Sequence, residues 1–87
     1  MIFIKREFDA YLDEMDKITI LLPSGSYNGE SAFFTLTNQE STYPLEIIDR
    51  KTLQNSVKYI CKTNTPISIG SKYMILDEHG RKTDLQI

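Results

Sequence analysis

The apolar residues of this chain come in short runs, and residues that favour turns separate each run from the next. The longest nearly apolar run, Ile18–Leu22, is rich in β-branched residues and ends at Pro23. It is far shorter than the roughly 20 apolar residues that a membrane-spanning helix needs. Short runs of this kind, bounded by turn residues, are typical of strands. The sequence therefore favours a fold that is built from short strands.

An alternation of apolar and polar residues supports this interpretation. In residues 57–62, Val57, Tyr59 and Cys61 fall on one face of a strand, while lysines fall on the other. The extended segments that we expect are residues 2–12, 18–22, 31–37, 44–48, 57–62, 67–69, 72–76 and 83–87. The connections that we expect are a turn at 13–16, a loop at 23–29, one helical turn within 49–56, a turn at 64–66 and a hairpin-type turn at 77–80.

Seven or eight short strands with frequent turn signals predict an all-β fold, namely a small antiparallel β-sandwich. One segment leaves an alternative open. Phe8, Tyr11, Leu12 and Met15 recur at helical spacing, so residues 7–15 could also form a short helix in a mixed α+β domain. We prefer the strand, because apolar and polar residues also alternate through this segment.

Length and composition limit the class of protein. The chain has 87 residues, enough for one domain, with 40% hydrophobic and 25% charged residues, as in ordinary soluble domains. A net charge of −2, with only Arg81-Lys82 as a local basic pair, excludes a nucleic-acid binder that relies on a basic surface. The single cysteine, Cys61, excludes an intrachain disulfide framework. The basic residues Lys5 and Arg6 are not followed by a long apolar stretch, as a secretory signal would require.

These features lead us to expect a cytoplasmic protein without nucleic-acid or membrane partners. The last three residues, Leu85, Gln86 and Ile87, have the pattern of a strand that is cut in its course. We therefore expect residues 1–87 to be a single domain from a longer, multidomain protein.

Two sets of residues could carry chemistry. On a helix, Asp9, Asp13 and Asp16 would share a face, as a carboxylate pair for glycosidic hydrolysis or as oxygen ligands of calcium. On a strand they scatter, and they then form a solvated acidic turn. Cys61 and His79 could form a nucleophile pair, although a packed thiol and an exposed turn histidine are the simpler interpretation. The glycines form no phosphate-binding motif, and we expect no catalytic residue, no metal and no cofactor.

Aromatic residues give the one positive signal for binding. A sugar ring has apolar C–H faces and a rim of hydroxyl groups, so it binds to an exposed flat ring that has planar polar groups beside it. Tyr11 is expected to point outward from its strand, and Tyr27 lies in a loop of glycine, serine and asparagine. These two tyrosines are the candidate carbohydrate-binding residues. Phe33, Phe34 and Tyr59 are expected to pack in the core or between strands.

Four segments, in order along the chain, carry a resemblance to a known family. They are Phe8–Met15, Ile18–Pro23, Lys58–Cys61 and Lys82–Ile87. Together they resemble the extreme N-terminal domain of type I pullulanases from Bacillus-like bacteria. The opening block and the Thr-Asp-Leu-Gln-Ile ending are the most specific parts, while residues 24–56 match only in their alternation.

This resemblance implies a fold and a function. Type I pullulanases belong to glycoside hydrolase family 13 and hydrolyse α-1,6 linkages in pullulan and related α-glucans, with catalytic acids in a downstream (β/α)₈ barrel. The chain is similar to their first accessory domain, a β-sandwich that resembles carbohydrate-binding module family 68. That family implies binding of α-1,4-linked malto-oligosaccharides with Tyr11 as a sugar contact, and it implies that downstream domains of the same chain are partners. The alternative is a structural, interdomain or dimerisation domain with an exposed apolar patch around Phe3, Phe33 or Ile87.

Overall fold

The computed structural model describes residues 7–14, 17–25, 27–38, 40–68 and 70–85, which form seven strands and one 3-10 turn. None of the described segments is a helix with the length and apolar character that a membrane crossing requires. The elements are β1 (Asp9–Glu14), β2 (Lys17–Pro23), η1 (Tyr27–Gly29), β3 (Phe34–Thr37), β4 (Thr42–Thr52), β5 (Ser56–Lys62), β6 (Met74–Asp77) and β7 (Lys82–Asp84).

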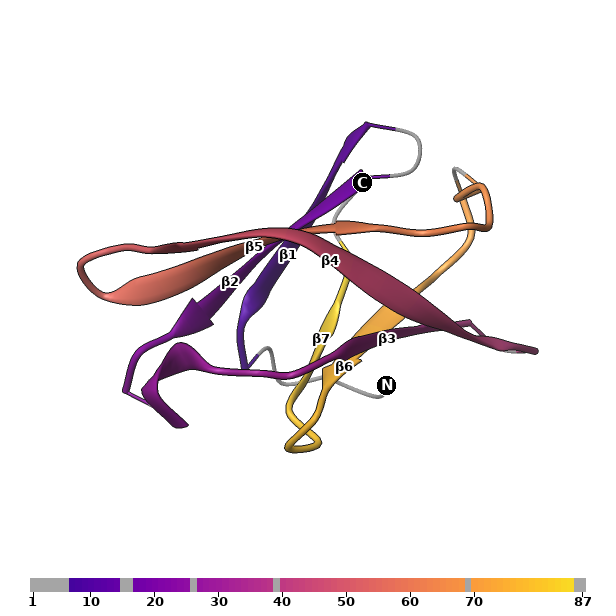
Figure 1. Ribbon diagram of the computed structural model, residues 1–87. Coiled ribbons are helices and arrows are strands. Elements are labelled where there is room, and N and C mark those ends of the chain that lie inside the picture. Colours follow the sequence, from indigo (N-terminus) through magenta and orange to yellow (C-terminus); the bar gives the residue numbers. More distant parts are fainter. Residues whose placement is uncertain (1–6, 15–16, 26, 39, 69, 86–87) are drawn as a thin grey trace.

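The seven strands form one sheet in the order β1-β2-β5-β4-β3-β6-β7, and every pair is antiparallel. β4 is the longest strand, and it pairs with β3 through its first residues and with β5 through the remainder. The sheet curls so that its outer strands approach each other (Figure 1). There the Glu7 amide donates to the Lys82 carbonyl at 3.2 Å, and the Lys82 amide donates to the Glu7 carboxylate at 2.9 Å. The result is a nearly closed barrel.

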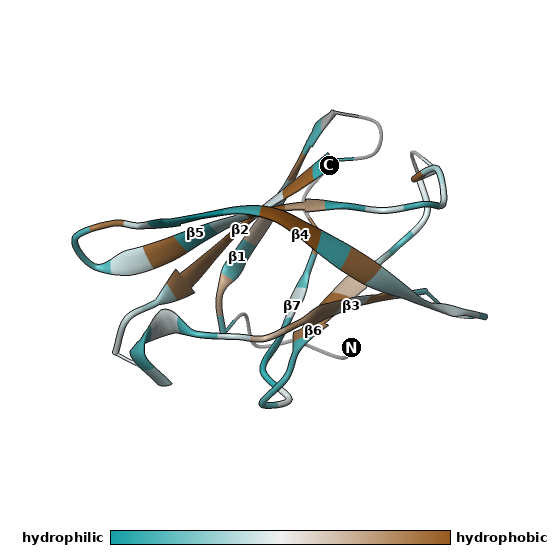
Figure 2. Ribbon diagram, viewed as in Figure 1, coloured by the Kyte–Doolittle hydropathy of each residue, from teal (hydrophilic) through white to brown (hydrophobic). Residues whose placement is uncertain are grey.

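Alternating side chains fill the interior of this barrel. Apolar and polar residues alternate along β5 and the first part of β4 in Figure 2, and the burial of β5 follows the same period. The ring of Phe34 meets the ring of Tyr59 edge-on at 5.0 Å between centroids. The buried apolar residues are Phe8, Ala10, Ile18, Ile20, Leu22, Phe34, Leu36, Leu45, Val57, Tyr59, Cys61, Ile67, Tyr73, Ile75 and Leu85.

The prediction of an antiparallel all-β fold is confirmed. The two halves of the sheet, β1-β2-β5 and β3-β6-β7, are joined because β4 pairs with β5 in one half and with β3 in the other. The α+β alternative is wrong, because β1 pairs with β2 residue by residue from Asp9 to Leu12. Residues 2–6 of the expected strand at 2–12 lie outside the described residues. Residues 15 and 16 of the expected turn at 13–16 lie outside them as well.

The helical turn that we expected within residues 49–56 is also wrong. β4 continues to Thr52, and a tight turn follows in which the Leu53 amide donates to the Ser56 carbonyl at 2.8 Å. This end of β4 is exposed at every residue from Ile48 to Thr52. A strand that is hydrated on both faces shows no alternation of apolar and polar residues, so the sequence pattern gives no strand signal there.

A β-bulge interrupts the pairing of β4 with β5. Ile47 pairs with Cys61 and Asp49 pairs with Ile60, which leaves Ile48 as the extra residue. Ile48 is 45% exposed, whereas Ile47 packs against the core. The bulge therefore turns one large apolar side chain of β4 outward.

Candidate functional site

Tyr11 lies on the outer face of β1, opposite Thr19 of β2. Its ring is 37% exposed, while its chain neighbour Ala10 is fully buried. Asp9 and Asp13 are exposed on either side of it in the strand, and the Asp13 carboxylate accepts a hydrogen bond from the Thr19 hydroxyl. The structure thus places Tyr11 outward, as the alternation predicted, between two exposed aspartates.

Tyr27 lies in η1, between β2 and β3, and is 59% exposed. Its ring stacks on the imidazole of His79, with 3.8 Å between centroids and an interplanar angle of 4°. The guanidinium carbon of Arg81 lies 5.0 Å from the centroid of the same ring. Tyr27 and Asn28 have φ values of 49° and 57°, in the left-handed region that costs about 1–2 kcal/mol for a residue with a side chain. The ring contacts help to hold this unfavourable backbone.

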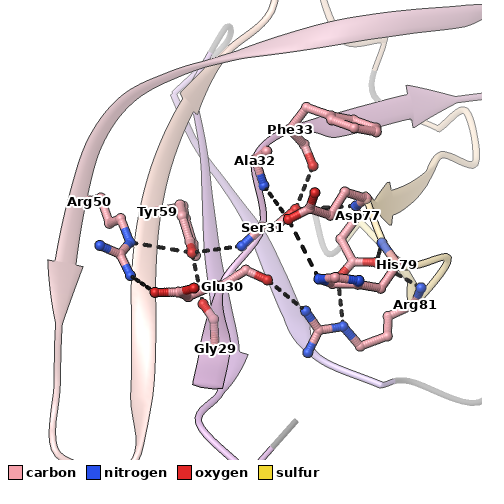
Figure 3. A network of polar contacts seen from close by, with 11 residues as sticks. Gly29, Glu30, Ser31, Ala32, Phe33, Arg50, Tyr59, Asp77, His79 and Arg81 are labelled. Atoms are coloured by element: carbon pink, nitrogen blue, oxygen red, sulfur yellow. Dashed lines mark hydrogen bonds and ion pairs between the residues drawn. The ribbon is translucent and has the colours of Figure 1, made fainter. Parts of the chain in front are cut away.

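Arg81 closes an ion pair within the turn between β6 and β7 and also joins this turn to the loop that carries Tyr27. Arg81 Nε donates to Asp77 Oδ2 at 2.5 Å, and Arg81 Nη2 donates to the Glu30 carbonyl at 3.1 Å (Figure 3). The other Asp77 oxygen accepts the amides of His79 and Arg81 at 3.0 and 2.8 Å. Asp77 and Arg81 are both buried. Arg81, which the sequence presented as half of a basic pair, is therefore a structural residue.

The hydroxyl of Tyr59 forms a second connection, on the other side of the same loop. It donates to the Gly29 carbonyl at 2.7 Å and accepts the Ser31 amide at 3.1 Å and Arg50 Nε at 3.4 Å (Figure 3). The hydrogen bond to Tyr59 raises the pKa of the Arg50 guanidinium above its ordinary value. Arg50 is therefore a permanent cation that is held from below by a buried phenol.

A polar hollow of about 230 Å³ opens between these two connections. The hollow, which we call the Arg50 hollow, is lined by Glu30, Ser31, Ala32, Arg50, Tyr59 and Glu78. Arg50 Nη2 lies 3.5 Å from Glu30 Oε1, with side chains that are 47% and 64% exposed. Glu78 Oε1 accepts the Ala32 amide at 2.7 Å and lies 3.5 Å from His79 Nε2. Two carboxylates and one guanidinium thus meet at one opening.

A larger hollow of about 420 Å³ lies elsewhere, between the β3–β4 turn and the segment before β6. The described residues that line it are Asn38, Glu40, Gly70, Ser71 and Lys72, and none of them is aromatic. It therefore offers hydrogen-bonding groups but no aromatic ring among its described lining residues.

The structure does not bring together the residues of the other two candidate sites. Cys61 is fully buried in β5, and burial raises the pKa of its thiol to about 12, so the nucleophilic thiolate does not form near neutral pH. His79 lies in the exposed turn after β6 and stacks on Tyr27 instead. Asp9 and Asp13 lie on a strand, while Asp16 lies outside the described residues. Over the described parts of the chain, no three potential metal ligands gather into one group.

Sequence reasoning missed the Arg50 hollow entirely. Its charged residues come from three segments that are far apart in the chain, and each of them has the pattern of an ordinary solvated charge. A local signal was present only for the neighbouring ion pair, since Asp77 and Arg81 flank a glycine turn at a spacing of four residues.

The nearly closed antiparallel sheet, with exposed aromatic rings on its surface, defines the chain as a small all-β module. Residues 8–87 match the family model of the pullulanase N1-terminal domain, and the chain belongs to that family. It is 33% identical over its whole length to the pullulanase of Bacillus subtilis strain 168.

Solved structures agree with this assignment. The pullulanase type I from Bacillus subtilis strain 168, crystallised in complex with maltose, matches 100% of this chain with a TM-score of 0.89 and 33% identity. The pullulanase from Anoxybacillus sp. LM18-11 in complex with maltotriose matches 91% of it with a TM-score of 0.83 and 31% identity. The chain spans 12% of the length of each of these relatives.

Proposed function

We propose that this chain is the non-catalytic N-terminal accessory domain of a type I pullulanase, a glycoside hydrolase family 13 enzyme that cleaves α-1,6 linkages in α-glucans. We further propose that it binds α-1,4-linked malto-oligosaccharides and works in the cytoplasm. Family membership supports the first part, and relatives crystallised with maltose and maltotriose support the class of ligand. The single free cysteine fits a reducing compartment.

The observation that carries sugar binding is the placement of Tyr11. The partly exposed ring of Tyr11, on the outer side of β1, offers one face to the apolar side of a glucosyl unit, and the carboxylates of Asp9 and Asp13 can accept hydrogen bonds from its hydroxyls. One stacked ring provides little contact area after ordering costs, so binding by the chain alone is weak. In a longer protein, such a site would raise the effective concentration of glucan near the downstream catalytic (β/α)₈ barrel.

We expect Tyr11→Ala to weaken maltotriose binding about two- to tenfold, because a ring contact of about 0.5–1.5 kcal/mol corresponds to that range. The measurement is a titration of this chain with maltotriose, followed by amide NMR shifts. Leu53→Ala is the matched control, because Leu53 has the same 37% exposure but lies in the β4–β5 turn. If millimolar maltotriose moves no resonance near Tyr11, binding through this residue is wrong.

The second candidate function is a structural, interdomain or dimerisation role without a ligand. Phe33 is 53% exposed and Ile48 is 45% exposed, and large apolar side chains at such exposure favour contact with another protein surface. Phe3 and Ile87, which we expected in the same patch, lie outside the described residues. Deleting the domain from a full-length pullulanase discriminates between the roles. Lost stability or altered oligomeric state with an unchanged KM on pullulan would favour the structural role.

A further inference from the structure

We propose that the Arg50 hollow is a second sugar subsite, which takes one glucosyl unit of an α-glucan. The inference rests on the proposed function, since it assumes that the chain binds malto-oligosaccharides. The hollow is built from the β2–β3 loop, the exposed end of β4, Tyr59 of β5 and the β6–β7 turn, and none of its lining residues belongs to β1, which carries Tyr11. The two subsites therefore share no residue.

Arg50 supplies donors that the Tyr59 hydroxyl helps to position. Its Nε is held by the buried Tyr59 hydroxyl at 3.4 Å, and its guanidinium carbon lies 5.8 Å from the centroid of the Tyr59 ring. A guanidinium carries five N–H donors, so others remain for a ligand. The neighbouring contact with Glu30 is long, at 3.5 Å, and exposed. Ion pairs of that kind contribute little stability, so sugar hydroxyls can replace this one at little cost.

Glu78 supplies acceptors on the opposite wall. Its Oε1 is fixed by the Ala32 amide at 2.7 Å, while the Glu78 amide is itself held by the Ser31 hydroxyl at 3.2 Å. An ionised carboxylate has about four acceptor positions, so the group can still accept hydrogen bonds from a ligand. A donor on one wall and an acceptor on the other suit adjacent hydroxyl groups, which both donate and accept.

The size and charge of the hollow define the class of ligand. Its volume of about 230 Å³ is below the range of about 300–1,000 Å³ that is usual for pockets of drug-sized ligands, so it suits one small unit and not a long chain. Its rim carries both signs of charge, from Arg50 and from two glutamates. An anion would face the carboxylates and a cation would face the guanidinium. A neutral polyhydroxyl unit avoids both kinds of repulsion.

The Tyr27–His79 stack braces the hollow from the side. Glu78 directly precedes His79, and the Tyr27 carbonyl accepts the amide of Glu30 at 3.0 Å. Both carboxylates of the rim are thus attached to segments that the stacked rings hold together. Because His79 covers one face of the Tyr27 ring, stacking of sugar on Tyr27 is restricted, and the polar rim carries the recognition in this subsite.

The test is a titration of this chain with maltotriose and maltotetraose, followed residue by residue through amide NMR shifts. We expect two groups of resonances to move, one along β1 and one at Glu30–Ala32 and Glu78–His79. Arg50→Gln is expected to weaken about tenfold the sugar affinity that the second group of resonances reports, as for the loss of hydrogen bonds to a charged group. Arg50→Lys keeps the charge but loses the planar fork of donors, and it should weaken the same affinity. Lys51→Gln, at the next exposed position of β4, is the control and should change neither group.

The outcomes separate the subsite from the proposed function. If saturating sugar moves the β1 resonances but not those of Ala32 and Glu78, the subsite is wrong and the proposed function stands. If the second group moves equally in Arg50→Gln, Arg50→Lys and the unchanged chain, the assignment of Arg50 is wrong. If no resonance moves anywhere, the proposed sugar binding itself is overturned, and the subsite with it. A dispersed spectrum of each variant verifies that it is folded.

Discussion

Replacing Asp77 with alanine is expected to lower the free energy of unfolding by about 3–5 kcal/mol, because it removes one partner of a buried ion pair. The side chains of Asp77 and Arg81 are 0% and 8% exposed. The change also removes the acceptor for the amides of His79 and Arg81. A domain of this length has a total stability of about 4–13 kcal/mol, at roughly 0.05–0.15 kcal/mol per residue. At the lower end of this range, Asp77→Ala would unfold a large fraction of the molecules near 37 °C.

Urea denaturation, with circular dichroism as the readout, measures this effect. The double change Asp77→Ala with Arg81→Met removes both charges of the pair and should be less destabilising than Asp77→Ala alone. Lys82→Ala, at the next position and exposed, should stay within about 0.5 kcal/mol of the unchanged chain. A loss below about 1 kcal/mol for Asp77→Ala would contradict a structural role for this ion pair.

Gly29→Ala is expected to cost about 2–5 kcal/mol, since two effects add. Gly29 has a φ of 69°, where a side chain costs about 1–2 kcal/mol. A Cβ at this position would also lie 2.7 Å from Val57 Cγ2 and 3.2 Å from the Leu22 carbonyl oxygen. Both neighbours belong to strands of the barrel wall, so they can move little, and overpacking of this kind costs about 1–3 kcal/mol.

Gly80→Ala is the matched control for Gly29→Ala. Gly80 has a similar φ of 82°, but a Cβ there would meet no atom within 4 Å. Gly80→Ala should therefore show the backbone cost alone, and the difference between the two variants in urea denaturation measures the steric clash. Equal losses would mean that the chain around Gly29 shifts to accept a methyl group without cost.

The parts of the fold that could be predicted from sequence are those with one buried and one open face. β5 alternates strictly, and its pattern gave both the strand and the inward placement of Cys61. The end of β4 could not be predicted, because Arg50, Lys51 and Thr52 are exposed alike. A strand that extends into water on both sides leaves no periodic trace in its residues.

The candidate site divides in the same way. The outward placement of Tyr11 follows from local alternation, and it was predicted. The Arg50 hollow depends on contacts between residues far apart in the chain, such as Ala32 with Glu78, which are 46 positions apart. Charged residues that only folding brings together cannot be told from ordinary surface charges in the sequence. Only the three-dimensional arrangement distinguishes Arg50 from its exposed neighbour Lys51.

The shared strand β4 has a consequence for how the domain loses its structure. Its residues Thr42–Leu45 complete the pairing of β3, and Glu46–Thr52 complete the pairing of β5. Neither half of the barrel can therefore open without exposing a strand on which the other half depends. This continuity favours cooperative unfolding as one unit, with no stable half-folded species. In a protein of several domains, such a module would either stay fully folded or unfold completely when its neighbours move.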